Sequence, residues 1–291
     1  MAKNMLPPLP GSNYSMLLSH VPFNKSAIDD VIPNARHVTI IRHPVSAYES
    51  VFGFFKISNH AKIKHNTTQN PFKTFLANTS MYFNRIHDPY HKTLLSNRQI
   101  FDLGLELEDY ANETMVDHVI QRISKELDLV MILEYFDESL LLLKKLLCWE
   151  FEDIVYTQRN KRSDTLRYDI GDLERQTILK LNSADFKLYQ HFNITLWLKV
   201  DAYGPNFSKD LATFRGMLNK MHSECIDDDK FDVNYGGRRN ETFVKINAPE
   251  YCSRMNKTSF AYLANRQRLN QSHAAINQLS EAINQSHATT N

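Results

Sequence analysis

Residues 37–55 have the sequence HVTIIRHPVSAYESVFGFF, which combines a short β-branched run, a tight turn and a helix-forming segment. The run at 37–41 is typical of a buried strand. Pro44 suits the first turn of a helix, and apolar residues follow it at helical spacing, at Val45, Tyr48, Val51, Phe52 and Phe55. The stretch therefore predicts a strand, a turn and a helix in succession.

A second copy of this pattern begins at residue 129. The segment LVMILEY (129–135) predicts another buried strand, and a Leu-rich helix should follow over 136–149 with Asp137 as its N-cap. Two buried strands that each lead into a helix favour an α/β fold with a mainly parallel sheet flanked by helices. The intervening residues 57–97 are expected to form a mostly irregular insertion with short helices at the rim of a site, and 163–200 should be helical.

Charge and hydropathy exclude several classes of protein. The 291 residues include 34 Lys and Arg against 33 Asp and Glu, a net charge of +1, so we expect no nucleic acid partner. The richest apolar stretch, 140–149, is interrupted by Lys144 and Lys145 and is too short to span a membrane. The first twenty residues contain no apolar core of signal-peptide length.

Asparagine usage points to the secretory lumen. Eleven of the 25 Asn residues lie in N-x-Ser/Thr sequons, among them our glycosylation candidates Asn66, Asn78 and Asn112. The alternative is that an Asn-rich composition inflates the count. Sequons without an entry signal suggest that an N-terminal segment is absent from this chain.

The three cysteines allow two interpretations. In an oxidising lumen the natural pairing is Cys225 with Cys252, which leaves Cys148 as a buried free thiol within the Leu-rich run. On cysteine count alone, three unpaired thiols in a cytosolic protein fit equally well.

The turn at residues 42–44 has the features of a phosphate site. Arg42 at the end of a buried strand offers a rigid fork of N–H donors, and the positive end of the following helix points to the same place. Ser50, eight residues after Arg42, can add a hydroxyl donor. We therefore interpret Arg42 and Ser50 as a phosphate clamp, although a surface Arg before a capped helix is a common alternative.

These residues resemble the 3′-phosphate motif of sulfotransferases that use 3′-phosphoadenosine 5′-phosphosulfate (PAPS). Together with FDLGL (101–105), 129–156, HFNITLW (191–197) and APEYC (248–252), the stretch is similar to the galactose 3-O-sulfotransferases over roughly 11–271. The resemblance implies a P-loop-type sulfotransferase fold, PAPS as co-substrate without a metal, and a glycolipid or glycan acceptor with terminal galactose. It also implies a membrane-anchored enzyme on the lumenal side of the Golgi apparatus.

Two departures from the family matter. His43 stands where the family usually has Asp or Asn, so the turn should be capped differently. The family's Lys-bearing 5′-phosphosulfate loop belongs upstream of a segment that here starts at Gly11. We therefore expect a sulfotransferase domain over 1–264 that is truncated at its N-terminus and lacks loop and anchor, followed by a polar, weakly amphipathic helical tail over 265–291.

Sulfuryl transfer needs a general base for the acceptor hydroxyl, and His20, in LLSHVPFN, is our candidate. A histidine that only hydrogen-bonds at a strand end is the alternative. His87 and His91 in HDPYH should lie in a loop rather than in a metal site. Glu134, at the end of the second strand, is expected to cap the turn before the Leu-rich helix, and a contact with acceptor or cofactor is the alternative.

Two functions therefore remain in competition. The first is transfer of a sulfuryl group from PAPS to the 3-hydroxyl of terminal galactose, as in galactosylceramide. The second is a non-catalytic lumenal binding or scaffold protein that keeps the sulfotransferase fold. The sequence does not determine the acceptor or the oligomeric state.

Overall fold

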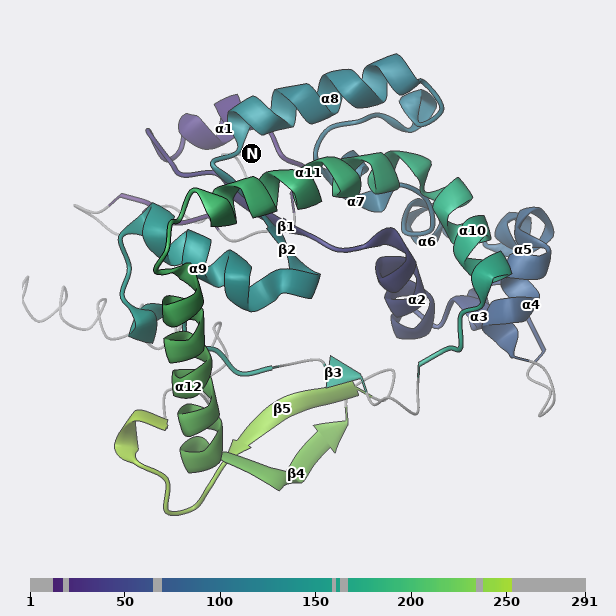
Figure 1. Ribbon diagram of the computed structural model, residues 1–291. Coiled ribbons are helices and arrows are strands. Elements are labelled where there is room, and N and C mark those ends of the chain that lie inside the picture. Colours follow the sequence, from purple (N-terminus) through teal and green to yellow (C-terminus); the bar gives the residue numbers. More distant parts are fainter. Residues whose placement is uncertain are drawn as a thin grey trace, which may run out of the picture. The chain divides into compact units, whose positions relative to one another are not determined.

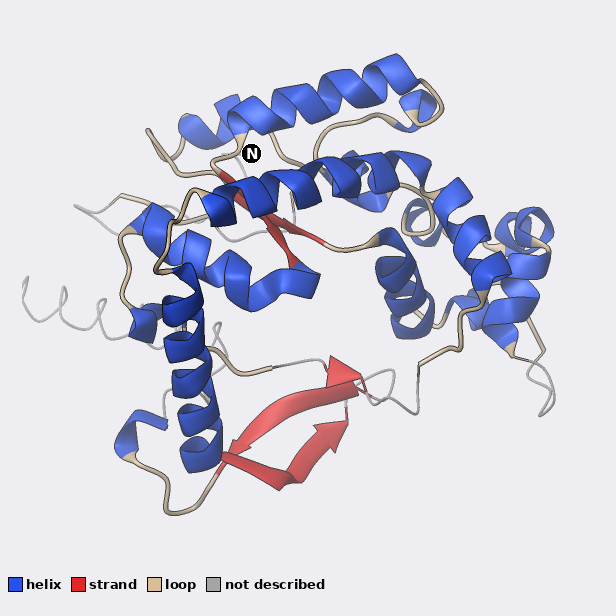
Figure 2. Cartoon of the chain, in the orientation of Figure 1, coloured by secondary structure: helices blue, strands red, loops and turns tan. Residues whose placement is uncertain are grey.

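The computed structural model in Figure 1 describes residues 13–17, 21–64, 70–158, 161–162, 167–233 and 238–252. The predicted tail helix at 265–291 lies outside them. The chain divides into two units, and each is described by itself. The first comprises 1–156, 162–217 and 235–238, and the second comprises 157–161, 218–234 and 239–291. Most of the described elements are helices, as Figure 2 shows.

Two parallel strands organise the first unit. Strand β1 (Val38–Ile41) pairs with β2 (Leu129–Ile132), with Val38 opposite Leu129 and Ile41 opposite Ile132. The predicted strands and their parallel pairing are thereby confirmed. The predicted burial of β1 is wrong, because only Ile41 is buried in it and Ile40 is 45% exposed. The second strand is shorter than predicted, because residues 133–135 form a 3₁₀ turn, η3 (Leu133–Tyr135).

Helices cover β2. Helices α9 (Phe136–Leu147) and α11 (Ser183–Asp201) pack against it, and α8 (Glu113–Glu126) packs against α11 (Figure 1). All four residues of β2 are buried, which is the usual situation of a parallel strand. The predicted helical region at 163–200 is confirmed from residue 172 onward, as α10 (Asp172–Leu181) and α11 with a break at Asn182. Residues 167–171 are not helical, contrary to the prediction, and 163–166 lie outside the described residues.

The predicted helix after β1 is α2 (Pro44–Phe54), with Pro44 in its first turn. Its Phe52 is fully buried, and the ring lies 5.0 Å from that of Phe72 and 5.4 Å from that of Phe75, measured between centroids. These partners belong to the insertion at 57–97, which we expected to be a mostly irregular rim. The short helices expected there are present: α3 (Ile57–His60), α4 (Pro71–Ala77), α5 (Thr79–Arg85) and α6 (Pro89–Thr93). The expectation of a mostly irregular rim is wrong, because these helices supply large aromatic side chains to the core.

The start of α9 also differs from the prediction. The helix begins at Phe136 with Tyr135 at the N-cap, because η3 leads directly into it, so Asp137 is not the N-cap. The Asp137 carboxylate instead accepts hydrogen bonds from the Tyr156 hydroxyl at 3.0 Å and from Arg215 Nε at 2.9 Å. Four further short elements complete the unit: α1 (Lys25–Asp29), α7 (Arg98–Asp102), η2 (Leu107–Asp109) and η4 (Phe151–Ile154).

The second unit contains a sheet that the sequence did not predict. Its strand order is β3 (Lys161–Arg162), β5 (Arg238–Val244) and β4 (Ile226–Val233), and β4 and β5 are antiparallel. Helix α12 (Phe207–Cys225) belongs to this unit from residue 218 onward.

The cysteines are placed as follows. A disulfide joins Cys225 to Cys252, both fully buried, with their Cα atoms 5.3 Å apart. Cys148 is a free thiol, but it is exposed rather than buried as expected. The reason is that α9 ends at Leu147, and Cys148 takes the left-handed C-cap conformation, with φ of 53°, beyond the packed face of the helix.

Candidate anion-binding site at the carboxyl end of the sheet

Arg42 directly follows β1, and a side chain from a distant helix fixes its backbone. The Arg42 N–H donates to Gln99 Oε1 at 2.7 Å, and the Arg42 carbonyl accepts from Gln99 Nε2 at 2.9 Å. Gln99 belongs to α7. The planar guanidinium of Arg42 therefore extends from an anchored strand end, which suits it to bidentate recognition of an oxyanion.

The turn after Arg42 is capped by a histidine ring. His43 is the N-cap of α2, and its Nδ1 accepts the N–H of Val45 at 3.3 Å. The His43 carbonyl accepts the N–H of Ala47 at 3.0 Å, and Pro44 has no N–H to offer. In this chain the cap is thus made by an imidazole nitrogen. The Val45 and Ala47 N–H groups are thus engaged within the turn itself and are not donors for an anion.

The surroundings of His43 favour its neutral form. Burial lowers the pKa of His43, and the charge of Arg175 on α10 lowers it further, whereas the carboxylate of Glu134 opposes both by raising it. The ring packs edge-on against Tyr189 of α11, with centroids 4.9 Å apart. With Nδ1 accepting from the Val45 N–H, the neutral ring carries its proton on Nε2.

Glu134 has a different role from the one predicted. Its Oε1 accepts the backbone N–H of His43 at 3.0 Å, so it does not cap the turn before the Leu-rich helix. The hydrogen bond connects the residues that follow β1 and β2. Arg42 and Glu134 therefore both lie where the strands end, at the same edge of the sheet.

Ser50 lies in α2, half-buried, six residues beyond Pro44. At a rise of about 1.5 Å per residue, it is about 9 Å along the helix axis from the first turn. Arg42 and Ser50 therefore belong to one rigid strand–helix unit. An oxyanion held by both would lie along the side of α2 rather than at its end.

Sequence analysis missed three contributors to this region. Gln99 is 57 residues from Arg42, and Asp185 lies still further along the chain. Arg175 places an exposed positive charge near His43 from α10. No local motif marks these residues, because tertiary packing of α7, α10 and α11 brings them to the strand end.

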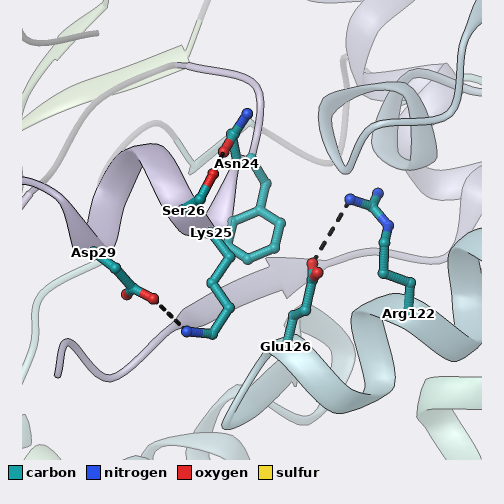
Figure 3. Close-up of a pocket in the computed structure, with 7 residues that line it drawn as sticks. Asn24, Lys25, Ser26, Asp29, Arg122 and Glu126 are labelled. Carbon is teal, nitrogen blue, oxygen red and sulfur yellow. Dashed lines mark hydrogen bonds and ion pairs between the residues drawn. The ribbon is translucent and has the colours of Figure 1, made fainter.

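A different polar region lies at the amino ends of the strands. A pocket of about 510 Å³ there is lined by Phe23, Asn24, Lys25, Ser26, Asp29, Arg122 and Glu126 (Figure 3). Lys25 pairs with Asp29, and Arg122 lies 3.7 Å from Glu126. The cations and anions that line this pocket thus compensate one another.

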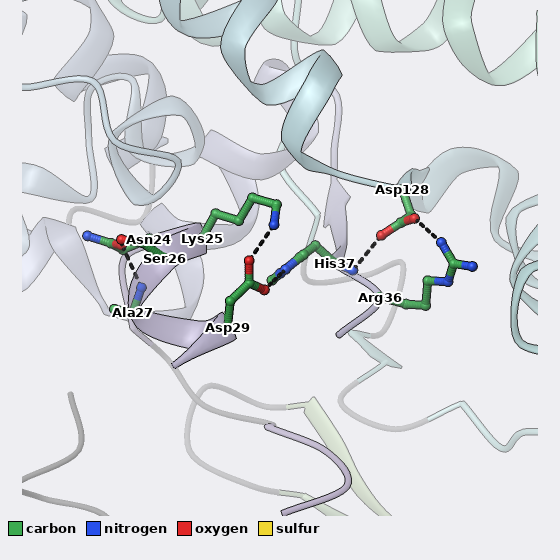
Figure 4. A network of polar contacts seen from close by, with 8 residues as sticks. All are labelled: Asn24, Lys25, Ser26, Ala27, Asp29, Arg36, His37 and Asp128. Atoms are coloured by element: carbon green, nitrogen blue, oxygen red, sulfur yellow. Dashed lines mark hydrogen bonds and ion pairs between the residues drawn. The ribbon is translucent and has the colours of Figure 1, made fainter. Parts of the chain in front are cut away.

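An adjoining network fixes the strand starts. The His37 N–H donates to Asp128 at 2.8 Å, Arg36 pairs with Asp128 at 2.9 Å, and the His37 ring contacts Asp29 at 2.7 Å (Figure 4). Burial alone would raise the pKa of Asp128, but the bonds from His37 and Arg36 outweigh it and hold that pKa below its usual value. Hydrogen bonds from Lys25 and then His37 likewise lower the pKa of Asp29. The network stabilises the amino edge of the sheet.

The other predicted site residues are distributed as follows. His20 and Asn66 lie outside the described residues, so the candidate base has no described position. Asn78 and Asn112 are exposed N-caps, and their side chains accept the N–H groups of Met81 and Met115, each at 3.3 Å.

The predicted HDPYH loop is partly helical. Its last three residues belong to α6, where Asp88 is the N-cap and lies 2.7 Å from His91 Nδ1. Within the described ranges, no group of three or more potential metal ligands is present.

Comparison with known proteins gives the family. The sequence model described as galactose-3-O-sulfotransferase matches residues 9–246, which is most of the chain. The chain belongs to the galactose-3-O-sulfotransferase family. Arg42, His43 and Ser50 therefore lie within the matched domain. Arg42 and His43 follow the carboxyl end of β1, and Ser50 lies in α2.

Individual relatives agree with this family. The chain is 32% identical over 232 residues to galactosylceramide sulfotransferase of Mus musculus and 31% identical over 230 residues to that of Bos taurus; each match covers 75% of this chain and 51% of the relative. It is 30% identical over 219 residues to galactose-3-O-sulfotransferase 3 of Mus musculus, covering 74% and 50%. The chain therefore spans about half the length of these relatives.

No solved structure matches the chain significantly. Among the helices that the structure describes, none combines the length and the apolar character needed to cross a lipid bilayer.

Proposed function

We propose that this chain is part of a PAPS-dependent sulfotransferase that acts on the 3-hydroxyl of terminal galactose in a glycolipid or glycan, such as galactosylceramide. The observation that carries the proposal is the family membership over 9–246, combined with an Arg anchored at the end of β1 immediately before α2. We further propose that the protein acts on the lumenal side of the Golgi membrane, where its sequons would be used.

The donor nucleotide suits the cation of Arg42 at the carboxyl end of β1. The 3′-phosphate of PAPS is a dianionic group that a guanidinium recognises with two parallel hydrogen bonds. Arg42 would hold this phosphate, and Ser50 would add one hydroxyl donor. Neutral His43 neither repels nor neutralises the phosphate, so recognition depends on Arg42.

Catalysis requires a proton acceptor and stabilisation of the leaving group. The galactose 3-hydroxyl attacks sulfur, the bond from sulfur to the bridging oxygen breaks, and adenosine 3′,5′-bisphosphate leaves with the electron pair. The hydroxyl proton passes to a general base, for which we propose His20. Positive groups near the bridging oxygen would stabilise its developing charge.

Calorimetric titration with adenosine 3′,5′-bisphosphate tests the clamp. Arg42→Ala should weaken binding by about 1.5–3 kcal/mol and Ser50→Ala by about 1 kcal/mol. Arg36→Ala removes the same side chain at the opposite end of β1 and is the matched control, with unchanged affinity expected. Unchanged affinity in Arg42→Ala would remove the clamp from the proposal.

Sulfate transfer tests the reaction itself. In a protein that transfers labelled sulfate from PAPS to a β-galactoside, His20→Ala should lower turnover about a hundredfold or more while nucleotide binding persists. Full turnover in His20→Ala would exclude His20 as the base. Nucleotide binding without transfer to any β-galactoside would instead favour a non-catalytic lumenal binding protein.

A further inference from the structure

We propose that Gln99 is a positioning residue for Arg42 and that buried Asp185 holds Gln99 in place; this inference rests on the proposed function of Arg42 as the 3′-phosphate ligand. Neither residue would touch the nucleotide. Their role is to fix the direction in which the arginine side chain leaves the strand.

The first link is the pair of hydrogen bonds between Gln99 and the Arg42 backbone. The amide oxygen accepts the Arg42 N–H at 2.7 Å and the amide nitrogen donates to the Arg42 carbonyl at 2.9 Å. This is the pattern by which a neighbouring strand would engage one residue. The side chain of Gln99 thus substitutes for a strand partner at a position just beyond the last ladder pair, Ile41 with Ile132.

The second link fixes the helix that carries Gln99. The Asp185 carboxylate, on α11, accepts the N–H groups of Ile100 at 2.8 Å and of Gln99 at 3.1 Å. Asp185 is only 3% exposed. A buried carboxylate is costly unless hydrogen-bonded, so this arrangement strongly favours a single position for the start of α7.

A third set of hydrogen bonds runs the other way, from N–H groups at the start of α11 to the residue before α7. Asn97 Oδ1 accepts the N–H groups of Ala184 at 3.0 Å and Asp185 at 3.1 Å. The Asn97 N–H in turn donates to Asn182 Oδ1 at 2.9 Å. The two helix starts therefore cap each other reciprocally, and Gln99 projects from a junction with little freedom to move.

The consequence concerns precision at the phosphate. Bidentate recognition of an oxyanion requires the guanidinium to be held close to its productive geometry, and the backbone of Arg42 sets where that side chain begins. Without Gln99, the Arg42 peptide groups would lose two partners just beyond the strand. We therefore expect a selective loss of 3′-phosphate recognition when Gln99 is replaced.

The experiment compares two nucleotides by calorimetry on the whole chain: adenosine 3′,5′-bisphosphate and adenosine 5′-phosphate. The dissociation constant of adenosine 5′-phosphate divided by that of adenosine 3′,5′-bisphosphate measures recognition of the 3′-phosphate alone, and it is large when that phosphate is bound well. Gln99→Leu should lower this ratio about tenfold and leave the affinity for adenosine 5′-phosphate unchanged. Gln121→Leu makes the same chemical change on an exposed face of α8 and should leave the ratio as in the wild type.

Gln99→Glu is the second variant, for use if the leucine variant does not fold. It keeps an acceptor for the Arg42 N–H but directs a carboxylate oxygen at the Arg42 carbonyl, so it should also lower the ratio. An unchanged ratio in folded Gln99 variants, or equal weakening of both nucleotides, overturns the positioning role. A wild-type protein that does not distinguish the two nucleotides, with no change in Arg42→Ala, overturns the proposed function of Arg42 as well. A ratio that collapses in Arg42→Ala but not in the Gln99 variants overturns only this inference.

Discussion

The backbone N–H of His43 donates to the side chain of Glu134 at 3.0 Å, across 91 positions of sequence. Each residue follows the end of one strand of the parallel pair, so the bond holds the two strand ends together beyond their last backbone pairing. It also places a carboxylate beside the imidazole that caps α2. The charge of Glu134 and the protonation of His43 are therefore linked.

Replacing Glu134 should shift the titration of His43. The carboxylate raises the pKa of His43 against burial and Arg175, so Glu134→Gln should lower that pKa further below its ordinary 6.5. The glutamine keeps an acceptor for the His43 N–H, and NMR titration of the ring protons measures the shift. Glu113→Gln, at an exposed position of α8, is the control. An unchanged His43 pKa in Glu134→Gln would contradict the coupling.

Asp185 should give the protein a pH-dependent stability. Burial raises the pKa of Asp185 to about 6, from 3.8 when unfolded. Between these values the folded state retains a proton that the unfolded state has lost, so stability from this group falls as pH rises from about 4 to about 6. Two pKa units correspond to roughly 3 kcal/mol.

Asp185→Asn isolates this effect because asparagine does not titrate. Urea denaturation measures the unfolding free energy of wild type and of Asp185→Asn at each pH. Between pH 4 and pH 7 the wild type should lose roughly 3 kcal/mol of unfolding free energy relative to Asp185→Asn. A difference that stays constant across that range would show that Asp185 does not change its protonation on folding.

The disulfide and the exposed free thiol can be distinguished chemically. Peptide mapping without reduction should find Cys225 linked to Cys252, and exposed Cys148 should react with a thiol reagent in the native protein. The bridge closes a loop with a sequence separation of 27, so its loss in Cys225→Ser with Cys252→Ser should destabilise the fold by about 3–4 kcal/mol. Cys148→Ser should leave stability nearly unchanged. A bridge that contains Cys148 would refute the pairing.

Glycan attachment can be separated from helix capping. Asn78 and Asn112 are exposed N-caps, and we expect both to carry glycans when the protein is produced in the secretory pathway. Thr114→Ala removes the sequon of Asn112 but keeps its bond to the Met115 N–H, so the protein should lose one glycan with little change in stability. Glycosidase-sensitive mass, compared between the two proteins, is the measurement. An equal mass before and after the substitution would exclude Asn112.

The sequence determined the local elements of this protein. The apolar runs at 38–41 and 129–132 specified two strands, and Pro44 specified the start of α2, because these preferences depend on neighbouring residues alone. Burial was predicted for both strands but holds only for β2, because helices pack against that strand. The motif around Arg42 also led to the family that comparison now shows. Predictions failed where a boundary depended on distant partners, as at Asp137, or where spacing was overlooked, as with Phe72 and Phe75 in the insertion.

Only the tertiary structure decided what holds the candidate site. Gln99, Asp185 and Glu134 reach the strand ends from segments 57 or more residues away, through hydrogen bonds that no local pattern specifies. The exposure of Cys148 likewise followed from where α9 ends against its neighbours rather than from its apolar sequence. A single chain encodes local conformational preferences directly, whereas contacts between distant residues arise only when packing selects one arrangement of helices around the sheet.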